Sequence, residues 1–295
     1  MPPRDLLLVT LVCLAWAGNF LTSAYSLQTI PPFLFTALRL GLLAVLLAPF
    51  LRAPAPGQWP RLVAVCLCNG VLHFGLSFWA LQTAGNLSSP AIVAQCYVPM
   101  AALLAWPILG ERFAWRTALA IAVSFAGVLV LGFDPLVLAA PLSLALMLVS
   151  AFFLALGTVL MRPLRGLGPF AMQGWTATIG IVPLLAISMA IEPGGFAAAA
   201  GADVPTWLGV AYSALVASLV GHGLYYVLVQ RHPIAQLTPW LLATPLFATA
   251  LGVAFWGDRP GPRLYLGGAM LLGGVLLIAL RAQAKSRPVP PASEA

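Results

Sequence analysis

Arg39 is the one fully charged side chain that falls well inside an apolar stretch of this 295-residue sequence. It lies seven residues after Pro32, which is about 10 Å along a helix at 1.5 Å per residue and too deep for a loop charge. A buried guanidinium is costly and needs an anion or several carbonyl groups beside it. Two interpretations stay open. Arg39 could hold a carboxylate in a bidentate fork, or it could tie its helix to neighbouring carbonyls or to an acid such as Asp134.

Two histidines, His73 and His222, each share a helical face with other polar residues. Asn69 and Ser77 lie four residues before and after His73, and Ser218 lies four residues before His222. Residues four apart share one side of an α-helix, and polar side chains in a lipid-embedded helix turn inward. A neutral imidazole there needs a partner and can take a proton near neutral pH. A single Ser, Thr, Asn or Gln in a membrane helix more often forms a hydrogen bond to a neighbouring helix than a contact to a ligand. The polar stripes taken together are therefore the stronger indication of an internal site.

Polar and aromatic residues on these inward faces form the predicted binding site for a small molecule. The predicted contacts are Arg39, His73, Ser77, Phe78, Trp79, Gln95, Tyr97, His222, Tyr225, Tyr226, Trp16 and Asn19. Pro99 and Pro245 each interrupt a helix, because proline removes a backbone donor and kinks the chain. The two kinks could be gating bends or static curves, and the aromatic residues could equally pack the core or form an interfacial belt.

The composition places these residues in a membrane. Hydrophobic residues make up 61% of the chain and charged residues 7%, and the mean hydropathy is +0.99, which leaves too little polar surface for a water-soluble protein of this length. Ten apolar runs are long enough to cross a bilayer as helices, at 6–26, 32–51, 62–83, 89–109, 117–132, 142–161, 170–191, 206–230, 235–256 and 264–281. The predicted fold class is all-α integral membrane, with a loose loop from Glu192 to Pro205.

One segment occurs twice in the sequence. Residues 99–131 run from a proline through a Gly-Glu-Arg turn to a Gly-Val pair, and residues 245–278 repeat this order with Gly-Asp-Arg. Extended backwards, the match gives five spans per copy. Because five is odd, the second copy crosses the membrane in the opposite direction. This predicts two inverted-topology repeats of five helices, 1–137 and 138–281, and a disordered cytoplasmic tail, 282–295. Such repeats are typical of transporters with a site near the midplane.

Basic residues indicate the orientation. With ten spans, eleven Lys and Arg residues fall on the side of the termini and two on the other side, so both termini are predicted to be cytoplasmic. These residues occur singly at the ends of spans rather than in a patch, and no nucleic-acid partner is predicted. The predicted partners are the lipid bilayer and a small-molecule substrate, and the protein is expected to be a monomer.

The five-plus-five spans, the AWAGNF segment of the first span, Arg39 and the twice-used proline-to-Gly-Val ending resemble EamA-type members of the drug/metabolite transporter superfamily. The likeness covers about residues 6–281. It implies a carrier in the bacterial inner membrane that exports a small metabolite, often an amino acid, and the aromatic amino acid exporters are the most similar kind. Asp258 departs from the usual Glu, and Pro260 and Pro262 change the second turn.

The acidic residues limit the mechanism. All seven lie in turns or tails, at Asp5, Glu111, Asp134, Glu192, Asp203, Asp258 and Glu294. A carrier that exchanges protons through a buried carboxylate would lack its working group here, so we predict a facilitator or coupling through a histidine. The three histidines are dispersed and the four cysteines have no ligand partners at zinc spacing, so no catalytic residue, metal or cofactor is predicted.

The leading interpretation is an inner-membrane exporter of amino acids, aromatic or other neutral ones, that works by alternating access. Efflux of lipophilic drugs is the first alternative, because an aromatic cavity would suffice for it. An integral-membrane enzyme that acts on lipids is the alternative from another class, and it would need the clustered His, Asp or Glu side chains that this sequence lacks.

Overall fold

The computed structural model describes residues 1–232 and 234–286, and of residues 234–236, 238, 285 and 286 it describes the backbone alone. In this part of the chain, ten helical segments are long and apolar enough to cross a membrane, and no strand occurs. They are numbered here as spans 1 to 10: Pro3–Ser26, Pro32–Phe50, Trp59–Ala84, Ser88–Leu109, Trp115–Gly132, Pro141–Met161, Pro169–Ile191, Val204–Arg231, Pro239–Trp256 and Pro262–Ala284. The all-α, ten-span prediction is confirmed, and no span limit differs from the predicted one by more than four residues.

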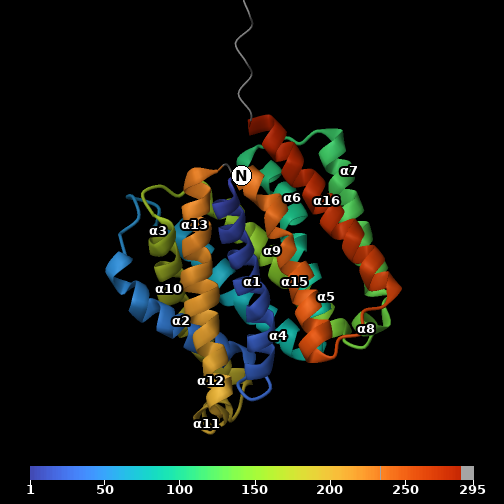
Figure 1. Ribbon diagram of the computed structural model, residues 1–295. Helices are drawn as coiled ribbons and strands as arrows, with labels where there is room; N and C mark the ends of the chain where they lie inside the picture. The colour runs from blue at the N-terminus through green and yellow to red at the C-terminus, as the bar shows by residue number, and fades with distance from the viewer. Residues whose placement is uncertain (233, 287–295) are drawn as a thin grey trace, which may run out of the picture.

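Several spans contain more than one helical element (Figure 1). The α-helices are α1 (Pro3–Ser26), α2 (Pro32–Leu47), α3 (Trp59–Cys66), α4 (Phe74–Ala84), α5 (Ser88–Val93), α6 (Tyr97–Leu109), α7 (Trp115–Gly132), α8 (Pro135–Leu138), α9 (Pro141–Met161), α10 (Pro169–Ile191), α11 (Gly195–Ala200), α12 (Val204–Ala211), α13 (His222–Arg231), α14 (Ile234–Leu241), α15 (Ala243–Leu251) and α16 (Pro262–Ser286). Short 3₁₀ segments are η1 (Ala48–Phe50) and η3 (Ala94–Cys96), and π-helical segments are η2 (Leu67–His73), η4 (Tyr212–Gly221) and η5 (Gly252–Trp256).

Local sequence explains where the spans begin and end. Spans 1, 2, 6, 7 and 10 begin at a proline, which suits the first helical turn because its missing N–H needs no partner there. Spans 3, 4 and 9 are followed by Gly85, Gly110 and Gly257, with φ of 65°, 71° and 81°. Glycine takes this left-handed conformation without the steric cost of a Cβ, so it stops each helix in a tight turn.

Four acidic residues bind helix starts at the end of the molecule opposite the termini. They are Asp134, Glu192, Asp203 and Asp258. Asp258 accepts from the backbone N–H groups of Leu87 and Ser88 at 3.0 and 2.9 Å, and Glu192 accepts from Phe33 N–H at 2.8 Å. The first N–H groups of a helix have no partner within it, so carboxylates satisfy and stabilise them. The repeated Gly-acid-Arg turn of the second half therefore joins span 9 to the start of span 4.

The contacts between spans follow an inverted twofold pattern. Span 1 packs against spans 8 and 9, and span 6 packs against spans 3 and 4. Span 2 packs against span 7, and span 5 packs against span 10. Exchanging each span with the one five places along leaves this set of contacts unchanged. The two halves, spans 1–5 and spans 6–10, are therefore related as the sequence repeat requires.

Spans 5 and 10 make the closest backbone contact, visible as the α7–α16 pair at the right of Figure 1. A Cβ atom on Gly127 would collide with the Gly267 carbonyl, and a Cβ on Gly267 would collide with the Gly127 carbonyl. Small residues let membrane helices approach in this way. The Gly127–Gly267 pair is called the glycine seam below.

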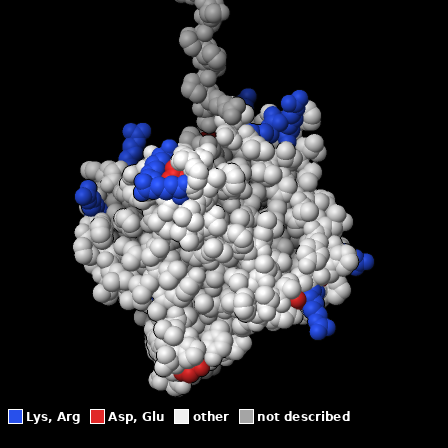
Figure 2. All heavy atoms as spheres, viewed as in Figure 1, with Lys and Arg blue, Asp and Glu red and all other residues white. Residues whose placement is uncertain are grey.

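The start of α1 and the end of α16 lie at the same end of the molecule (Figure 1). On the face shown in Figure 2, charged side chains lie towards the two ends and a broad band between them carries none, as a protein that crosses a membrane requires. Two local predictions need correction. The Glu192–Pro205 segment is not a loose loop, because α11 forms within it. The last helix continues to Ser286, while the rest of the predicted tail, 287–295, lies outside the described residues.

Candidate functional site

Arg39, near the middle of α2, is 2% exposed. Its Nη2 donates to the Ser218 Oγ at 2.6 Å. The guanidinium carbon lies 4.2 Å from the centre of the Phe74 ring and 5.2 Å from that of Phe78, within the range of a cation–π contact. Its Nε and Nη1 atoms are buried and have no hydrogen-bond partner. A buried cation with unoccupied donors is suited to an anionic ligand.

Asp134 does not neutralise Arg39, and this part of the prediction is wrong. Asp134 caps helix starts, with Oδ1 accepting from Leu136 N–H at 3.1 Å and Oδ2 from Leu264 N–H at 2.9 Å. No carboxylate of the described residues forms an ion pair with Arg39. The carboxylates are used instead at helix ends, where backbone N–H groups otherwise lack partners.

The π-helical segment η4 of span 8 provides the partner of Arg39. In a π-helix, each backbone hydrogen bond joins residues five apart in the sequence, and such segments are frequent at functional sites. Side chains use the carbonyls of η4. Ser218 Oγ donates to Ser213 O at 2.8 Å, and Trp16 Nε1 on α1 donates to Ala217 O at 3.0 Å. The Ser218 hydroxyl is therefore oriented to accept from Arg39.

The carbonyl of Ser218 is shared by two further side chains. Gln173 Nε2 on α10 donates to it at 3.2 Å, and His222 Nδ1 lies 3.1 Å from it. The imidazole of His222 keeps an exposed surface and its ring centre lies 5.2 Å from that of Trp16. The ring of Tyr225 also packs against Trp16, with the two ring centres 5.9 Å apart. Arg39 and this aromatic group thus share one residue of span 8.

His73, in span 3, packs in a different way. Its Nδ1 lies 2.8 Å from Ser150 Oγ on α9, and Ser150 Oγ donates to the carbonyl of His73 at 2.9 Å. Because that bond uses the only hydroxyl proton, Nδ1 of His73 is the donor to Ser150. Asn69 lies against Gly157 and Ser77 Oγ against the Met147 sulfur at 3.9 Å. The predicted polar face exists, but span 6 covers it.

The other residues predicted to contact the substrate do not lie together in one site. Phe78 belongs to the Arg39 site, where its ring lies 4.9 Å from Phe35. Trp79 pairs with Phe33 and Tyr226 with Phe170, both by ring edges. Asn19 accepts from Ser23 Oγ of its own helix at 3.1 Å. Gln95 and Tyr97 lie in and beside the η3 break and are partly buried. The structure therefore brings together Arg39 with Phe78 and, beside them, Trp16, His222 and Tyr225.

Pro99 and Pro245 occupy equivalent places in spans 4 and 9. Each is the third residue of a helix that restarts after a break, α6 after η3 and α15 after Leu242. Proline cannot donate to the carbonyl four residues earlier and its ring clashes with that carbonyl, so regular helix fails just before it. The matched breaks follow the prediction of paired kinks, and a gating role for them stays a prediction.

A pocket of about 460 Å³ opens between the ends of spans 1, 3 and 9, away from the termini. It is lined by Ala24, Leu27, Gln28, Leu81, Gln82, Gly85, Phe255 and Trp256. Gln82 Nε2 donates to Leu27 O at 2.7 Å. Leu27 and Leu81 belong to the same apolar cluster as Phe78. The same apolar cluster therefore lines the pocket, called the outer pocket below, and contacts Arg39 through Phe78.

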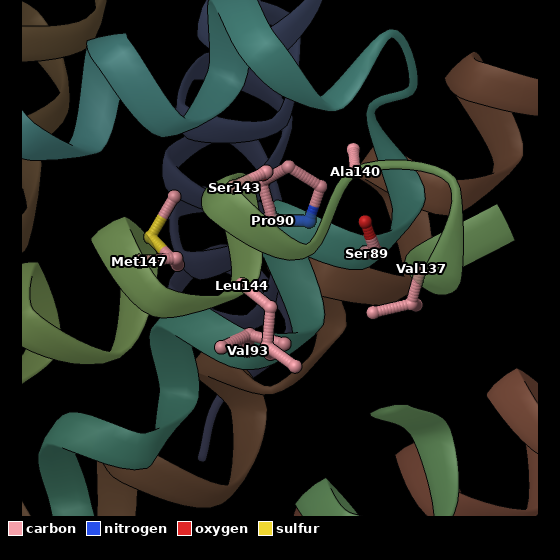
Figure 3. Close-up of a pocket in the computed structure, with 8 residues that line it drawn as sticks. All are labelled: Ser89, Pro90, Val93, Val137, Ala140, Ser143, Leu144 and Met147. Atoms are coloured by element: carbon pink, nitrogen blue, oxygen red, sulfur yellow. The ribbon is translucent and has the colours of Figure 1, made fainter. Parts of the chain in front are cut away.

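A second cavity, between α5 and α9, is not a substrate site. It is lined by Ser89, Pro90, Val93, Val137, Ala140, Ser143, Leu144 and Met147 (Figure 3). Its volume of about 10 Å³ has room for no more than one water molecule. Ser143 and Met147 of α9 face the α5 residues across it in Figure 3, so it is a small packing gap between spans 4 and 6.

The predicted contacts omit several residues of the Arg39 site. The sequence places Ser218 on a polar stripe but does not indicate that it bonds to Arg39. Gln173 carries a usable signal, because it is a lone amide in an apolar span. Phe74 carries no signal in the sequence, because aromatic residues in membrane helices have many uses. The π-helical segments also lack a signal, because they depend on packing between helices.

The fold and the buried cationic site together define a membrane transporter built from inverted repeats. The chain belongs to the EamA-like transporter family, which matches residues 4–133 and 141–280. These two matched segments correspond to the two halves of the structure. The predicted likeness to EamA-type transporters is thereby confirmed.

The individual relatives share about a quarter of their residues with this chain. The chain is 26% identical over 285 residues to a protein of Escherichia coli named "Probable amino-acid metabolite efflux pump", covering 94% of this chain and 95% of the relative. It is 27% identical over 254 residues to the "Probable terminal-alkyne amino-acid exporter" of Streptantibioticus cattleyicolor, covering 83% and 82%. A crystal structure at 19% identity superposes with a TM-score of 0.63 over 97% of this chain and 100% of that one, which shows the shared fold.

Proposed function

We propose that this protein exports small metabolites, with neutral amino acids as the substrate class, across the inner membrane of a bacterium. The family assignment supports a transporter rather than an enzyme, and the names of the amino-acid efflux relatives support the substrate class. The asymmetry of Lys and Arg supports cytoplasmic termini. A reporter that matures only in the cytoplasm, fused after the last residue, tests the orientation, and an inactive fusion would contradict it.

The observation that carries the substrate proposal is the state of Arg39. Two of its nitrogen atoms are buried without partners, and no described carboxylate pairs with it. A substrate carboxylate would supply both the missing charge and the missing acceptors, in the fork geometry that a guanidinium favours. Phe74 and Phe78 would then enclose the bound group in an apolar layer that strengthens this electrostatic contact.

Alternating access suits the place of this site. Arg39 is buried within the bundle, the outer pocket opens on the side away from the termini, and one apolar cluster contacts both. The volume of the pocket, about 460 Å³, lies within the usual range for small-molecule sites. In the proposed cycle, the two halves move so that Arg39 is reached from the cytoplasm and then through the outer pocket.

Replacement of Arg39 tests the proposal. Purified protein is reconstituted in proteoliposomes loaded with radiolabelled L-phenylalanine or L-leucine, and efflux is followed. We expect Arg39→Gln to lower efflux at least about tenfold, the size of one lost hydrogen bond to a charged group, and Arg39→Lys to be intermediate because the lysine has no fork. Arg116→Gln is the matched control, because Arg116 is exposed and also lies over an aromatic ring, that of Trp115.

Several results would contradict the proposal. Wild-type efflux by a folded Arg39→Gln protein, or by Arg39→Lys where the glutamine variant does not fold, would show that the guanidinium does not bind substrate. Export of cationic dyes in preference to amino acids would favour the multidrug alternative, for which the rings of Trp16, His222 and Tyr225 offer a surface. A buried positive charge at Arg39 argues against cationic substrates, because like charges repel strongly in an apolar interior.

A further inference from the structure

We infer that Gln173 is a second polar contact for the substrate, accepting a hydrogen bond from the ammonium group of an amino acid whose carboxylate is held by Arg39. The inference rests on the proposed function and deepens it. It assigns to Gln173 the discrimination between amino acids and carboxylic acids that lack an amino group.

The first step of the argument is proximity. Arg39 on span 2 and Gln173 on span 7 reach the same residue of span 8. Arg39 Nη2 donates to the side chain of Ser218 at 2.6 Å, and Gln173 Nε2 donates to its carbonyl at 3.2 Å. The guanidinium and the amide are therefore held beside each other by one residue, which is itself buried within η4.

The second step is the orientation of the amide. The carbonyl of Ser218 can only accept, so the NH₂ end of Gln173 must face it. The opposite assignment would place two oxygens against each other. The Oε1 atom then points away from Ser218, where it is buried and has no hydrogen-bond partner. A buried amide oxygen without a donor is unfavourable, and in native proteins such atoms call for an explanation.

The third step is chemical complementarity. Of the side chains that bond to Ser218 from other spans, Arg39 has unpaired donors at Nε and Nη1, and Gln173 has an unpaired acceptor at Oε1. An amino acid presents the opposite set on adjacent carbons, with two acceptor oxygens and one ammonium donor. A carboxylic acid without the amine would leave Oε1 unpaired, and an amine without the carboxylate would face the positive charge of Arg39.

A neutral acceptor for the ammonium group also fits the charges nearby. The carboxylates of the described residues lie in turns or near the ends of spans, so none is placed at mid-span to pair with an ammonium. An amide oxygen can accept from it without adding charge to the site. The carboxylate then pairs with Arg39 and the ammonium with the amide, while the additional charged group of an acidic or basic amino acid would have no mid-span partner among the described residues.

A purely structural role would explain the NH₂ group of Gln173 but not its Oε1 atom. Its bond to the Ser218 carbonyl ties span 7 to span 8, as interhelical hydrogen bonds commonly do. That role uses the NH₂ group and leaves the buried oxygen without a function. The two roles differ in their consequence, because a structural tie affects all ligands alike while an ammonium contact affects only those with the amino group.

The test measures binding to the purified full-length protein in detergent, where leakage of a weak acid through lipid cannot interfere. The probes are L-phenylalanine and 3-phenylpropanoate, which share the ring, chain and carboxylate and differ in the amino group. We expect the wild type to bind L-phenylalanine at least about tenfold more tightly, the contribution of one hydrogen bond to a charged group. Gln173→Leu should reduce this ratio to about one while leaving the affinity for 3-phenylpropanoate unchanged.

Two further variants make the result decisive. Thr178→Val is the matched control, because Thr178 lies on the same helix, bonds to the Gly174 carbonyl and is exposed, so it should keep the wild-type ratio. Arg39→Gln should weaken both probes together. Failure of Arg39→Gln to weaken either probe would overturn the proposed function, independently of the ratio measured for Gln173→Leu.

The inference on Gln173 is overturned by any of three results. They are equal binding of the two probes by the wild type, an unchanged ratio in Gln173→Leu, and equal weakening of both probes in that variant, which is the signature of a structural tie. If Gln173→Leu does not fold, Gln173→Met serves in its place, because methionine has a similar length and a far weaker acceptor. Binding of neither probe by the wild type would overturn the inference together with its substrate class.

Discussion

Spans 3 and 8 occupy equivalent places in the two halves, and each contains a π-helical segment beside a histidine. The segment Leu67–His73 ends at His73, and Tyr212–Gly221 ends directly before His222. In span 3, His73 and Ser150 bond to each other in both directions. In span 8, His222 stays exposed, and Ser218 receives the guanidinium of Arg39.

This difference indicates that the equivalent spans of the two halves have different roles. The distorted third span is common to both halves, so it belongs to the architecture. In the first half, His73 and Ser77 of this span bond to residues of span 6. In the second half, Ser218 bonds to an arginine that the repeat does not copy, since Thr176 stands at the position equivalent to Arg39. We expect the polar chemistry of transport to be concentrated around span 8.

We expect the largest difference between the two spans when Ser218 and Ser150, the serines that bond to Arg39 and His73, are replaced. Ser218→Ala removes the hydroxyl that positions Arg39, and we expect efflux of L-phenylalanine to fall about tenfold. Ser150→Ala should retain efflux and cost about 1 kcal/mol of stability, a typical value for a hydrogen bond between membrane helices. Proteoliposome efflux and thermal unfolding of both variants check this. Equal loss of efflux in the two variants would mean that the halves share the chemistry.

The two histidines should give smaller effects, and we expect only one of them to change the melting temperature. His73→Leu leaves the Ser150 hydroxyl without its donor, so we expect a lower melting temperature, whereas His222→Leu should melt close to the wild type because its ring is exposed. Efflux with and without a pH gradient tests coupling in the same proteins. If transport follows the gradient, loss of both histidines should remove that dependence. A strict dependence that survives the double variant would rule out coupling through histidine.

The smallest effect concerns the starts of the same two spans. Span 8 is capped by Asp203, whose Oδ1 accepts from Thr206 N–H at 2.9 Å, while Gln58 at the start of span 3 gives no side-chain cap. The hydroxyl and N–H of Thr206 lower the pKa of Asp203 below its usual 3.8. The ionised form is therefore favoured by folding, so its stabilisation is present above pH 3.8 and is lost as the pH falls through the lower, folded-state pKa.

Asp203→Asn provides the matched measurement, because asparagine can still cap the helix but does not ionise in this range. We expect a small drop in melting temperature of the wild type between pH 5 and about pH 3, beyond the drop shared with the variant. Identical pH profiles for the two proteins would show that the cap contributes nothing measurable.

The sequence predicts the ten spans well because each span must be apolar over its whole length. The repeat adds a second line of support, because each span of one half has an equivalent in the other half. Arg39 could be selected for the same reason, since a charge in such a span is costly. Its partner could not be chosen between Asp134 and neighbouring carbonyls, and it is in fact the hydroxyl of Ser218. Which helix covers which polar face depends on long-range packing, so the sequence did not show that Asn69, His73 and Ser77 lie against span 6.

The glycine seam has a mechanical consequence. At this crossing, Gly127 and Gly267 bring two backbones together with no layer of side chains between them, and side chains are the parts of a helix surface that can change rotamer and slide. A movement that opens the two ends of the protein in turn would therefore leave spans 5 and 10 in contact at the glycine seam, while the other spans move relative to them. We expect the outer pocket and Arg39, which lie on other spans, to travel furthest relative to the seam.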